Sequence, residues 1–544
     1  MTRREALLSA LVLFAASLAV RIVAAAVIVF PKPEDTAYYF GVARNLVEGR
    51  GLVTDALWSF QTPDLVIPHP AFEVWLPLPS FLAAIPMALF GPTFAAAQVS
   101  SVLVGALVPV LAWILAADLA IERGLSIGRS RVVAIGTGLT AAVYLPLVLN
   151  SALPDSTMPF TAIVLAACLL MTRIARAPGL GRLTDPRLIA LGIMLGLGAL
   201  TRNETAWLAL IWAGIAWFAA VSVSRAVRVR LVVVVAVVAL AVFAPWAYRN
   251  LVVLGSPLPA GAATNALYLS GFDIFAWNDP PTLDRYLDIG LGGLLELRWI
   301  GLTHNLFNVL LLLGLPLSII GLAGLPGLLR SFTLRPLILI SLATFLFTSL
   351  VFPAATQWGT FLHGAGPVHV LLVVGAMFAL DAAIAWVGDR RGWTRPVAWL
   401  GPVLGVFGST LFSVVLLSSF GSGSVTTSRL YAELGSRMAA AGHPLDVNAG
   451  PVVSNFPIWM AETARIPALA LPDEPPADVL DMTRSFPGTR LLVLIDPQGT
   501  HWPADLEVGA PGSECFRPID LGASSDPATA DPLADVTVYE IACP

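Results

Sequence analysis

The chain of 544 residues is 57% hydrophobic and only 12% charged. Globular domains carry roughly 25% charged residues, so this composition excludes an ordinary soluble protein. The net charge of −4 comes without any basic run, so nothing in the sequence indicates a nucleic-acid partner.

The apolar residues gather in segments long enough to cross ~30 Å of hydrocarbon. We predict about eleven transmembrane helices, and therefore a mainly α-helical, polytopic membrane protein. Their approximate bounds are 7–30, 94–120, 131–150, 158–175, 187–201, 205–224, 230–247, 303–324, 335–352, 367–387 and 397–419. Another apolar stretch, 72–90, contains Pro77, Pro79 and Pro86, which are unfavourable inside a straight helix. We interpret it as a juxtamembrane or re-entrant element.

The distribution of arginine predicts the orientation, because short cytoplasmic loops collect Lys and Arg. Arginines concentrate at the N-terminus and in alternate loops, as at Arg129, Arg131, Arg390 and Arg391. This pattern places the N-terminus in the cytoplasm and, with an odd number of spans, the C-terminal region outside. Counting 72–90 as a span would invert the pattern for every later loop.

Directly after the first span, Glu34 and Asp35 form an acidic pair. Apolar residues then recur with the spacing of one helical face. They are Tyr39, Val42, Ala43, Leu46 and Val47. We predict a short amphipathic helix lying flat on the bilayer, capped by Asp35 or Thr36 and ended by Gly49 or Gly51.

The predicted outer loops contain most of the polar residues that could form a site. The first of these loops, 31–93, contains the acidic pair, His69 and Glu73. The later ones contribute Asp155, Arg202, Glu204, Arg249, Gln357 and His363. Since the cytoplasmic loops offer little besides arginine, we expect the working face to be the outer one.

The C-terminal region differs in composition from the rest. We predict a transmembrane domain at 1–420 and a small α/β domain at 421–544, outside the membrane. Short strands are expected at 451–453, 468–470, 490–495 and 536–539, between turn-forming residues. Cys515 and Cys543 lie in this region, where an outer compartment permits a disulfide, although two unpaired thiols are the alternative.

The order and sidedness of several short motifs resemble the C-type glycosyltransferase superfamily, the membrane enzymes that use polyprenyl-phosphate sugars. Protein O-mannosyltransferases and lipid A aminoarabinose transferases belong to it. The resembling segments are 35–39 with 43–46 and Gly49, His69-Pro70, Asp155, 200–202, 246–250, 455–457 and 461–463. Two positions depart from the pattern: Ala71 replaces a second proline, and Thr36 stands where an Asp-Glu pair would have its Glu.

The resemblance implies transfer of a sugar from a polyprenyl-phosphate donor to an acceptor hydroxyl on a glycan, protein or lipid. Asp35 would act as the general base, with Glu34 and Asp155 as further catalytic candidates. Arg202 and Arg249 would bind the donor phosphate, because guanidinium suits phosphate oxygens. His69, His363, Tyr39 and Gln357 are the substrate-binding candidates. A phosphate is a good leaving group, so no general acid is needed, and one displacement inverts the sugar.

Each candidate also has a structural interpretation. Among the acids, Asp35 would be a helix cap, Glu34 a solvated residue and Asp155 part of a turn. Arg202 would form an ion pair with Glu204 or snorkel, and Arg249 would be an interfacial anchor. His69 and His363 would have hydrogen-bonded structural roles. No Cys/His cluster has metal-ligand spacing. We expect no required cofactor, and a divalent cation between Asp35 and Asp155 stays open as an alternative.

We therefore expect an inverting glycosyltransferase in the bacterial plasma membrane, with its active site on the outer face. The alternative is a transporter or flippase for lipid-linked sugars. Transporters carry ionisable residues at mid-membrane and often inverted repeats, whereas here the spans are nearly free of charge and no repeat is visible. A non-catalytic scaffold would leave the outer acids and arginines unexplained.

Overall fold

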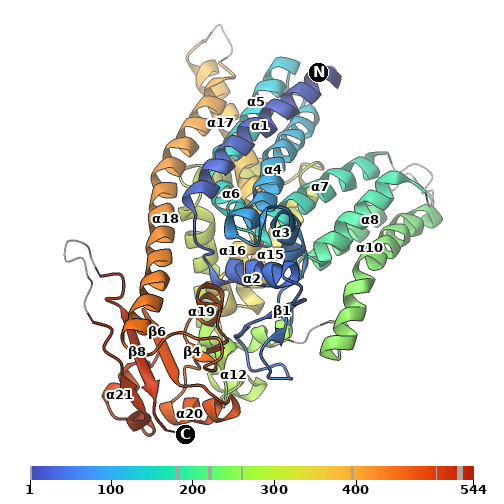
Figure 1. Ribbon diagram of the computed structural model, residues 1–544. Coiled ribbons are helices and arrows are strands. Elements are labelled where there is room, and N and C mark those ends of the chain that lie inside the picture. Colours follow the sequence, from blue (N-terminus) through green and yellow to red (C-terminus); the bar gives the residue numbers. More distant parts are fainter. Residues whose placement is uncertain are drawn as a thin grey trace.

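The computed structural model describes residues 3–177, 184–218, 223–258, 261–393, 397–497, 499–522 and 531–543. The chain forms a bundle of long helices with a small mixed domain at one end (Figure 1). The N-terminus lies at the opposite end of the bundle from that domain.

Within the described residues, six helices are long and apolar enough to cross a membrane, and two bent helix pairs raise this number to eight. The six are α1 (Arg3–Val27), α4 (Phe94–Glu122), α7 (Thr157–Arg176), α10 (Arg225–Leu254), α17 (Gly366–Arg390) and α18 (Leu400–Ala440). In the first bent pair, α5 (Ile127–Val143) is followed by α6 (Leu145–Ser151). In the second, Gly290–Leu312 is followed by Leu317–Leu328; these segments begin with α13 (Gly290–Thr303) and α14 (Leu317–Gly324).

The predicted number of eleven spans is not confirmed. The stretches 187–201, 205–224 and 335–352 correspond to shorter apolar helices, although 219–222 lie outside the described residues. These are α8 (Pro186–Ala199), α9 (Thr205–Phe218) and α15 (Arg335–Val351). A 14-residue helix is only about 21 Å long, short of the ~30 Å hydrocarbon layer.

Two predicted straight spans are bent. The segment predicted at 303–324 turns by 115° at a short break before Leu317, where Pro316 lacks the N–H that a continuous helix needs. The segment predicted at 131–150 bends by 52° at Tyr144. Arg21 of α1 stabilises this second bend, because its Nη1 donates to the carbonyl of Ala142 at 3.0 Å.

The apolar stretch 72–90 contains α3 (Leu78–Phe90), a helix of 13 residues. This is shorter than a transmembrane span requires. The helix packs against α2 (Glu34–Val47) and α4, so it supports the segment that carries the acidic pair.

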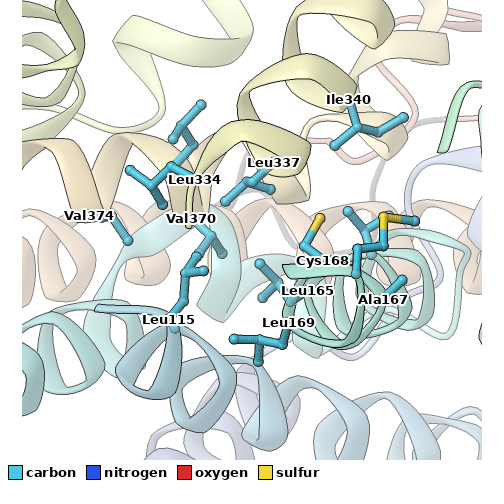
Figure 2. Packing of buried hydrophobic residues seen from close by; sticks show 14 of the residues in the cluster. Leu115, Leu165, Ala167, Cys168, Leu169, Leu334, Leu337, Ile340, Val370 and Val374 are labelled. Carbon is cyan, nitrogen blue, oxygen red and sulfur yellow. The ribbon is translucent and has the colours of Figure 1, made fainter. Parts of the chain in front are cut away.

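The main core of the bundle is formed by side chains from many of its helices. Figure 2 shows α4 and α7 contributing Leu115, Leu165 and Leu169, while Leu337 and Val370 come from α15 and α17. All of these side chains are buried, and interiors of this kind are close-packed. The core therefore holds the ends of α7 and α17, and the loops beside them, in a defined position.

We use the name C-terminal domain for strands β4–β8 and helices α19–α21. The strands are β4 (Val452–Ser454), β5 (Ala468–Ala470), β6 (Leu491–Ile495), β7 (Phe516–Pro518) and β8 (Val536–Ile541), and the helices are α19 (Pro457–Ala464), α20 (Pro476–Ser485) and α21 (Ala504–Glu507). The four strands predicted from the sequence are confirmed, with one or two residues of difference at their ends.

The sheet takes one strand from far away in the sequence. Its order is β2-β5-β4-β6-β8-β7, in which β2 (Ala56–Leu57) belongs to the segment 31–93 and pairs in parallel with β5. The other two short strands of that segment, β1 (Val53–Thr54) and β3 (His69–Pro70), pair antiparallel with each other. The strand pairing thus joins this segment to the C-terminal domain.

Helix α18 is longer than predicted, because it continues past 419 to Ala440. Its last turns bury Tyr431, Leu434 and Met438 against the C-terminal domain. These positions have the spacing of one helical face, so the residues after 420 begin with a helix rather than with strands.

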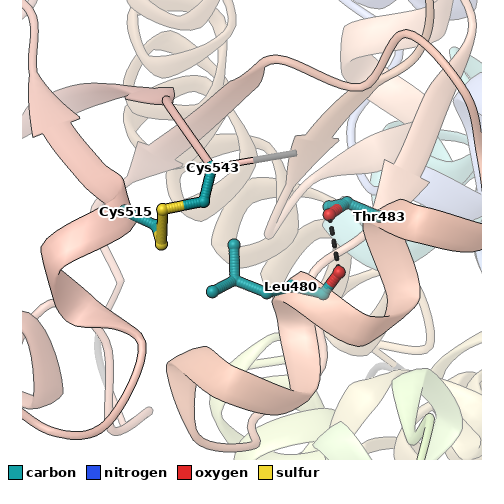
Figure 3. The surroundings of a disulfide bond; sticks show 4 residues. All are labelled: Leu480, Thr483, Cys515 and Cys543. Atoms are coloured by element: carbon teal, nitrogen blue, oxygen red, sulfur yellow. Dashed lines mark hydrogen bonds between the residues drawn. A yellow bond between two sulfur atoms is a disulfide. The ribbon is translucent and has the colours of Figure 1, made fainter.

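Cys515 and Cys543 form a disulfide that joins the start of β7 to the end of the chain beyond β8 (Figure 3). Leu480 and Thr483 of α20 lie beside it, and Thr483 donates a hydrogen bond to the Leu480 carbonyl at 2.8 Å. The cysteines are 28 residues apart.

Replacing both cysteines by serine is expected to lower the free energy of unfolding of the C-terminal domain by about 3–4 kcal/mol, because an open loop of this size gains conformational entropy in the unfolded chain. Thermal unfolding with and without reductant measures this. Reductant should shift the wild type and leave the Cys515→Ser/Cys543→Ser variant unchanged. An equal shift in both proteins would contradict the expectation.

Candidate active site

Helix α2 presents the acidic pair. It begins at Glu34 with Pro33 as its N-cap, so the predicted capping by Asp35 or Thr36 is wrong: no side chain caps this end. Acidic residues in a first turn interact favourably with the helix dipole. The helix ends at Val47, and Gly49 follows in the left-handed region at φ +81°, as the prediction of a glycine stop required.

Helix α2 is buried on more than one side, unlike the predicted amphipathic helix with a solvated face. The predicted apolar positions Tyr39, Val42 and Ala43 are buried, but so are Arg44 and Asn45 on the polar side. The reason is that α19 of the C-terminal domain packs on α2. The helix therefore lies between the membrane bundle and the C-terminal domain.

Three of the predicted site residues meet at one point. His363 lies between Asp35 and Asp155: its Nε2 is 3.1 Å from Asp35 Oδ2 and its Nδ1 is 3.4 Å from Asp155 Oδ2. The three residues come from α2, from the loop before α7 and from the short helix α16 (Thr360–Gly364). Gly359 begins α16 at φ +122°, a conformation that favours glycine.

The three side chains differ in accessibility. Asp35 is 26% exposed, whereas His363 is 2% and Asp155 0% exposed. Asp155 Oδ1 also accepts the backbone N–H of Thr157 at 2.8 Å, and the Thr157 hydroxyl lies 3.2 Å from His363 Nδ1. Asp155 and Thr157 thus contact the Nδ1 side of the imidazole in the interior, while Asp35 contacts Nε2 and is partly exposed to solvent.

The electrostatic setting favours a charged histidine. Burial alone lowers the pKa of His363, but the charges of Asp35 and Asp155 more than offset this and raise the pKa to about 10. At neutral pH the imidazole therefore carries a proton on each nitrogen. The resulting cation lies between two carboxylates.

Arg202 lies beside this group but is already paired. Its Nη2 is 2.6 Å from Glu204 Oε1 and donates to the Thr360 carbonyl at 2.9 Å, while its Nη1 donates to the Ser156 hydroxyl at 3.1 Å. Burial would lower the pKa of Arg202, but the charge of Glu204 raises it. Buried Tyr39 is close enough for Asp35 and Arg202 to act on its pKa, which burial raises.

The other predicted residues lie elsewhere. Arg249 stacks over Trp246 at 4.9 Å and donates to Asn250. His69 is buried with Glu73, at 3.5 Å between Nε2 and Oε2. Gln357 is exposed, and its side-chain amide donates a hydrogen bond to the Pro353 carbonyl. Glu34 turns away from Asp35 to accept the backbone N–H groups of Ile458 and Trp459 at 3.0 and 3.3 Å.

Ser156, Thr157 and Thr360 were not predicted from the sequence. The first two directly follow Asp155, and a hydroxyl next to a candidate acid is the signal that could have identified them, because such side chains commonly bind a neighbouring polar group. Thr360 contacts Arg202 through its backbone carbonyl, which no residue type signals.

A divalent cation between Asp35 and Asp155 stays a prediction. The two ring nitrogens of His363 lie between these carboxylates. In the part of the chain that the structure describes, no group of three or more His, Cys, Asp or Glu side chains is arranged to hold a metal ion.

Neither a protein-family model nor a curated protein sequence matches the chain. Solved structures do match. ArnT from Cupriavidus metallidurans bound to undecaprenyl phosphate is similar with a TM-score of 0.57 and 14% identity, over 98% of this chain and 99% of that one. An Archaeoglobus fulgidus oligosaccharyltransferase tethered with an acceptor peptide matches with a TM-score of 0.55 and 15% identity, over 95% of this chain and 72% of that one.

At these identities the likeness concerns the fold. It extends over nearly the full length of the chain, and the apo state of the Cupriavidus protein gives the same result, with a TM-score of 0.55 over 98% of both chains. The chain shares the fold of these solved structures.

Proposed function

We propose that the protein is an inverting glycosyltransferase that moves a sugar from a polyprenyl-phosphate carrier to an acceptor hydroxyl, with Asp35 as the general base. The fold supports this, since a solved structure of the same fold binds undecaprenyl phosphate. The donor sugar and the acceptor, whether glycan, protein or lipid, are to be identified by assay.

The observation that carries the proposal is the unequal exposure of the two acids. Asp35 and Asp155 contact the same histidine, but only Asp35 is accessible, at 26% against 0%. A general base must come within hydrogen-bond reach of the proton it removes. Asp35 can therefore receive a proton from an acceptor hydroxyl, and Asp155 acts through His363.

The proposed step balances as follows. The acceptor hydroxyl gives its proton to Asp35 while its oxygen bonds to the anomeric carbon of the sugar. The bond between that carbon and the phosphate oxygen breaks, and polyprenyl phosphate leaves with the electron pair. The His363 cation orients Oδ2 of Asp35 and leaves its other oxygen for the acceptor.

The departing phosphate needs a cation, and we assign Arg202 to this role because it adjoins the reacting group. Its present partner Glu204 and its contacts to Ser156 and Thr360 fix the guanidinium in place, and a fixed guanidinium suits phosphate oxygens. Arg249 lies at the outer end of α10, and we propose it as a second phosphate contact.

The proposed location is a bacterial plasma membrane, with the site on the outer face. The arginine-rich loops predict a cytoplasmic N-terminus, and the C-terminal domain lies at the opposite end of the bundle from that terminus (Figure 1). The proposed site lies beside the C-terminal domain, through α2 and α19. The polyprenyl tail of the donor would stay in the hydrocarbon between helices.

The test uses the purified full-length protein with a panel of polyprenyl-phosphate sugars labelled in the sugar. We expect one donor to be consumed, with the label appearing on an acceptor in inverted configuration. A transporter or flippase would instead move a lipid-linked sugar between the leaflets of a liposome without breaking its bond to phosphate. That result, with no donor consumed, would replace the proposed function by the alternative.

A further inference from the structure

We infer that Glu34 is a positioning residue, through which the C-terminal domain sets the orientation of α2 and so directs Asp35 at His363. This inference rests on the proposed function of Asp35. It gives the two neighbouring acids separate tasks, one toward each side of the helix.

The first observation is where the Glu34 carboxyl goes. It lies partly buried in the junction, and its Oε1 accepts the backbone N–H groups of Ile458 and Trp459 at 3.0 and 3.3 Å. These groups belong to the first turn of α19, where helical N–H groups have no partner within their own helix. Glu34 thus caps α19 from 424 residues away in sequence.

The contact continues along both helices. Trp459 Nε1 donates to the Pro31 carbonyl at 2.9 Å, just before α2 begins. Further along, Arg44 and Glu462 form a buried ion pair. Gly41 faces the same carboxylate, and a Cβ at this position would lie 2.6 Å from Glu462 Oε2. The lack of a side chain at Gly41 is what permits this close approach.

These contacts fix the rotation of α2 about its axis. Positions 41 and 44 lie seven and ten residues after position 34, which places all three on one helical face. Asp35 is one residue on, turned by about 100°, and contacts His363 instead of α19. Any rotation that loosens Glu34 from α19 therefore also displaces the Asp35 carboxylate from His363.

The protonation state of Glu34 fits a role without charge. Burial raises its pKa to about 8, against the lowering effect of the two N–H groups, so the carboxyl is mainly neutral at pH 7. A neutral carboxyl still offers its carbonyl oxygen to both N–H groups. Glutamine offers the same oxygen, so the side chain can be replaced without losing the contact.

The test compares Glu34→Ala with Glu34→Gln, measuring kcat and the KM for the polyprenyl-phosphate sugar donor. We expect Glu34→Ala to lower kcat by about 10–100-fold, the size of effect that a displacement of about 1 Å produces. Donor KM should change less than about threefold, because the bundle and not α19 binds the lipid. Glu34→Gln should retain kcat within about threefold.

Arg465→Ala is the matched control. Arg465 pairs with Glu48 at 2.7 Å between the same two helices, but this pair is partly exposed and lies at the far end of α2. We expect no change in kcat. Trp459→Phe is a milder variant, which removes the hydrogen bond to Pro31 but keeps an aromatic ring beside Phe30 and Phe456. It should lower kcat less than Glu34→Ala, and it provides the test if the alanine variant folds poorly.

Two outcomes would overturn the inference. If Glu34→Gln is as inactive as Glu34→Ala, the Glu34 carboxyl takes part in the chemistry. If Glu34→Ala keeps full activity, the cap does not position Asp35. Asp35→Asn, assayed alongside, separates these outcomes from a failure of the proposed function: an active Asp35→Asn variant rejects the function itself, whatever Glu34 does.

Discussion

Asp35→Asn is expected to abolish sugar transfer while leaving the fold and donor binding intact. Asparagine has the shape of aspartate, and its amide can still lie beside His363, but it cannot accept the proton of the acceptor hydroxyl. Loss of a general base typically costs 10²–10⁴-fold in rate. The loss should appear in kcat with little change in donor KM, because the interaction is made only as the proton moves.

The control for this variant is Glu48→Gln. Glu48 directly follows α2 and is an exposed residue. Its replacement by glutamine therefore removes one carboxylate from the same segment without changing a contact of His363. Its transfer rate should equal that of the wild type. A single cooperative thermal unfolding transition in each of the three proteins would show that the fold is intact. Near-normal transfer by a well-folded Asp35→Asn protein would contradict the assignment of the base.

The sequence predicted the parts of this molecule that depend on local patterns. Short β-branched and apolar runs predicted β4 to β6 and β8, because a strand shows itself within a few residues. The spacing from Tyr39 to Val47 predicted α2 for the same reason. Asp35, Asp155 and His363 were identified as separate candidates, and the structure brings them together.

What the sequence could not predict depends on contacts between distant segments. No local pattern shows that β2 joins β5, whose residues are more than 400 positions away, or that Glu34 caps α19. The extra burial of α2 follows from the same packing. Pro316 explains the bend before Leu317. Because apolar residues continue on both sides of this proline, the sequence pattern predicts one uninterrupted span.

Replacement of His363 should strongly change the pH dependence of the free energy of unfolding. Its pKa lies near 6.5 in an unfolded chain and is raised to about 10 in the folded protein, where the charges of Asp35 and Asp155 outweigh the lowering effect of burial. A group of this kind stabilises the fold fully below pH 6.5. The stabilisation then declines as the pH rises and is gone above about pH 10.

His363→Gln removes the cation and leaves two carboxylates facing each other. At pH 6 we expect it to lower the free energy of unfolding by about 3–5 kcal/mol, the usual cost of removing one partner from a buried ionic group. The difference from the wild type should shrink through the window from pH 6.5 to 10 and vanish near pH 10. Transfer at pH 7 should also fall strongly, since Asp35 then loses the contact that orients its carboxylate.

Thermal unfolding of both proteins at pH 6, 8 and 10 measures this, because the titration of all other groups cancels in the difference. His501→Gln is the control: His501 is 70% exposed and lies 3.8 Å from Asp473, so its replacement should change little at any pH. If the difference between wild type and His363→Gln were as large at pH 10 as at pH 6, the histidine would act through packing alone. A cation between the two acids would then no longer explain how the Asp35 carboxylate is oriented, and the proposed mechanism would need another group for this role.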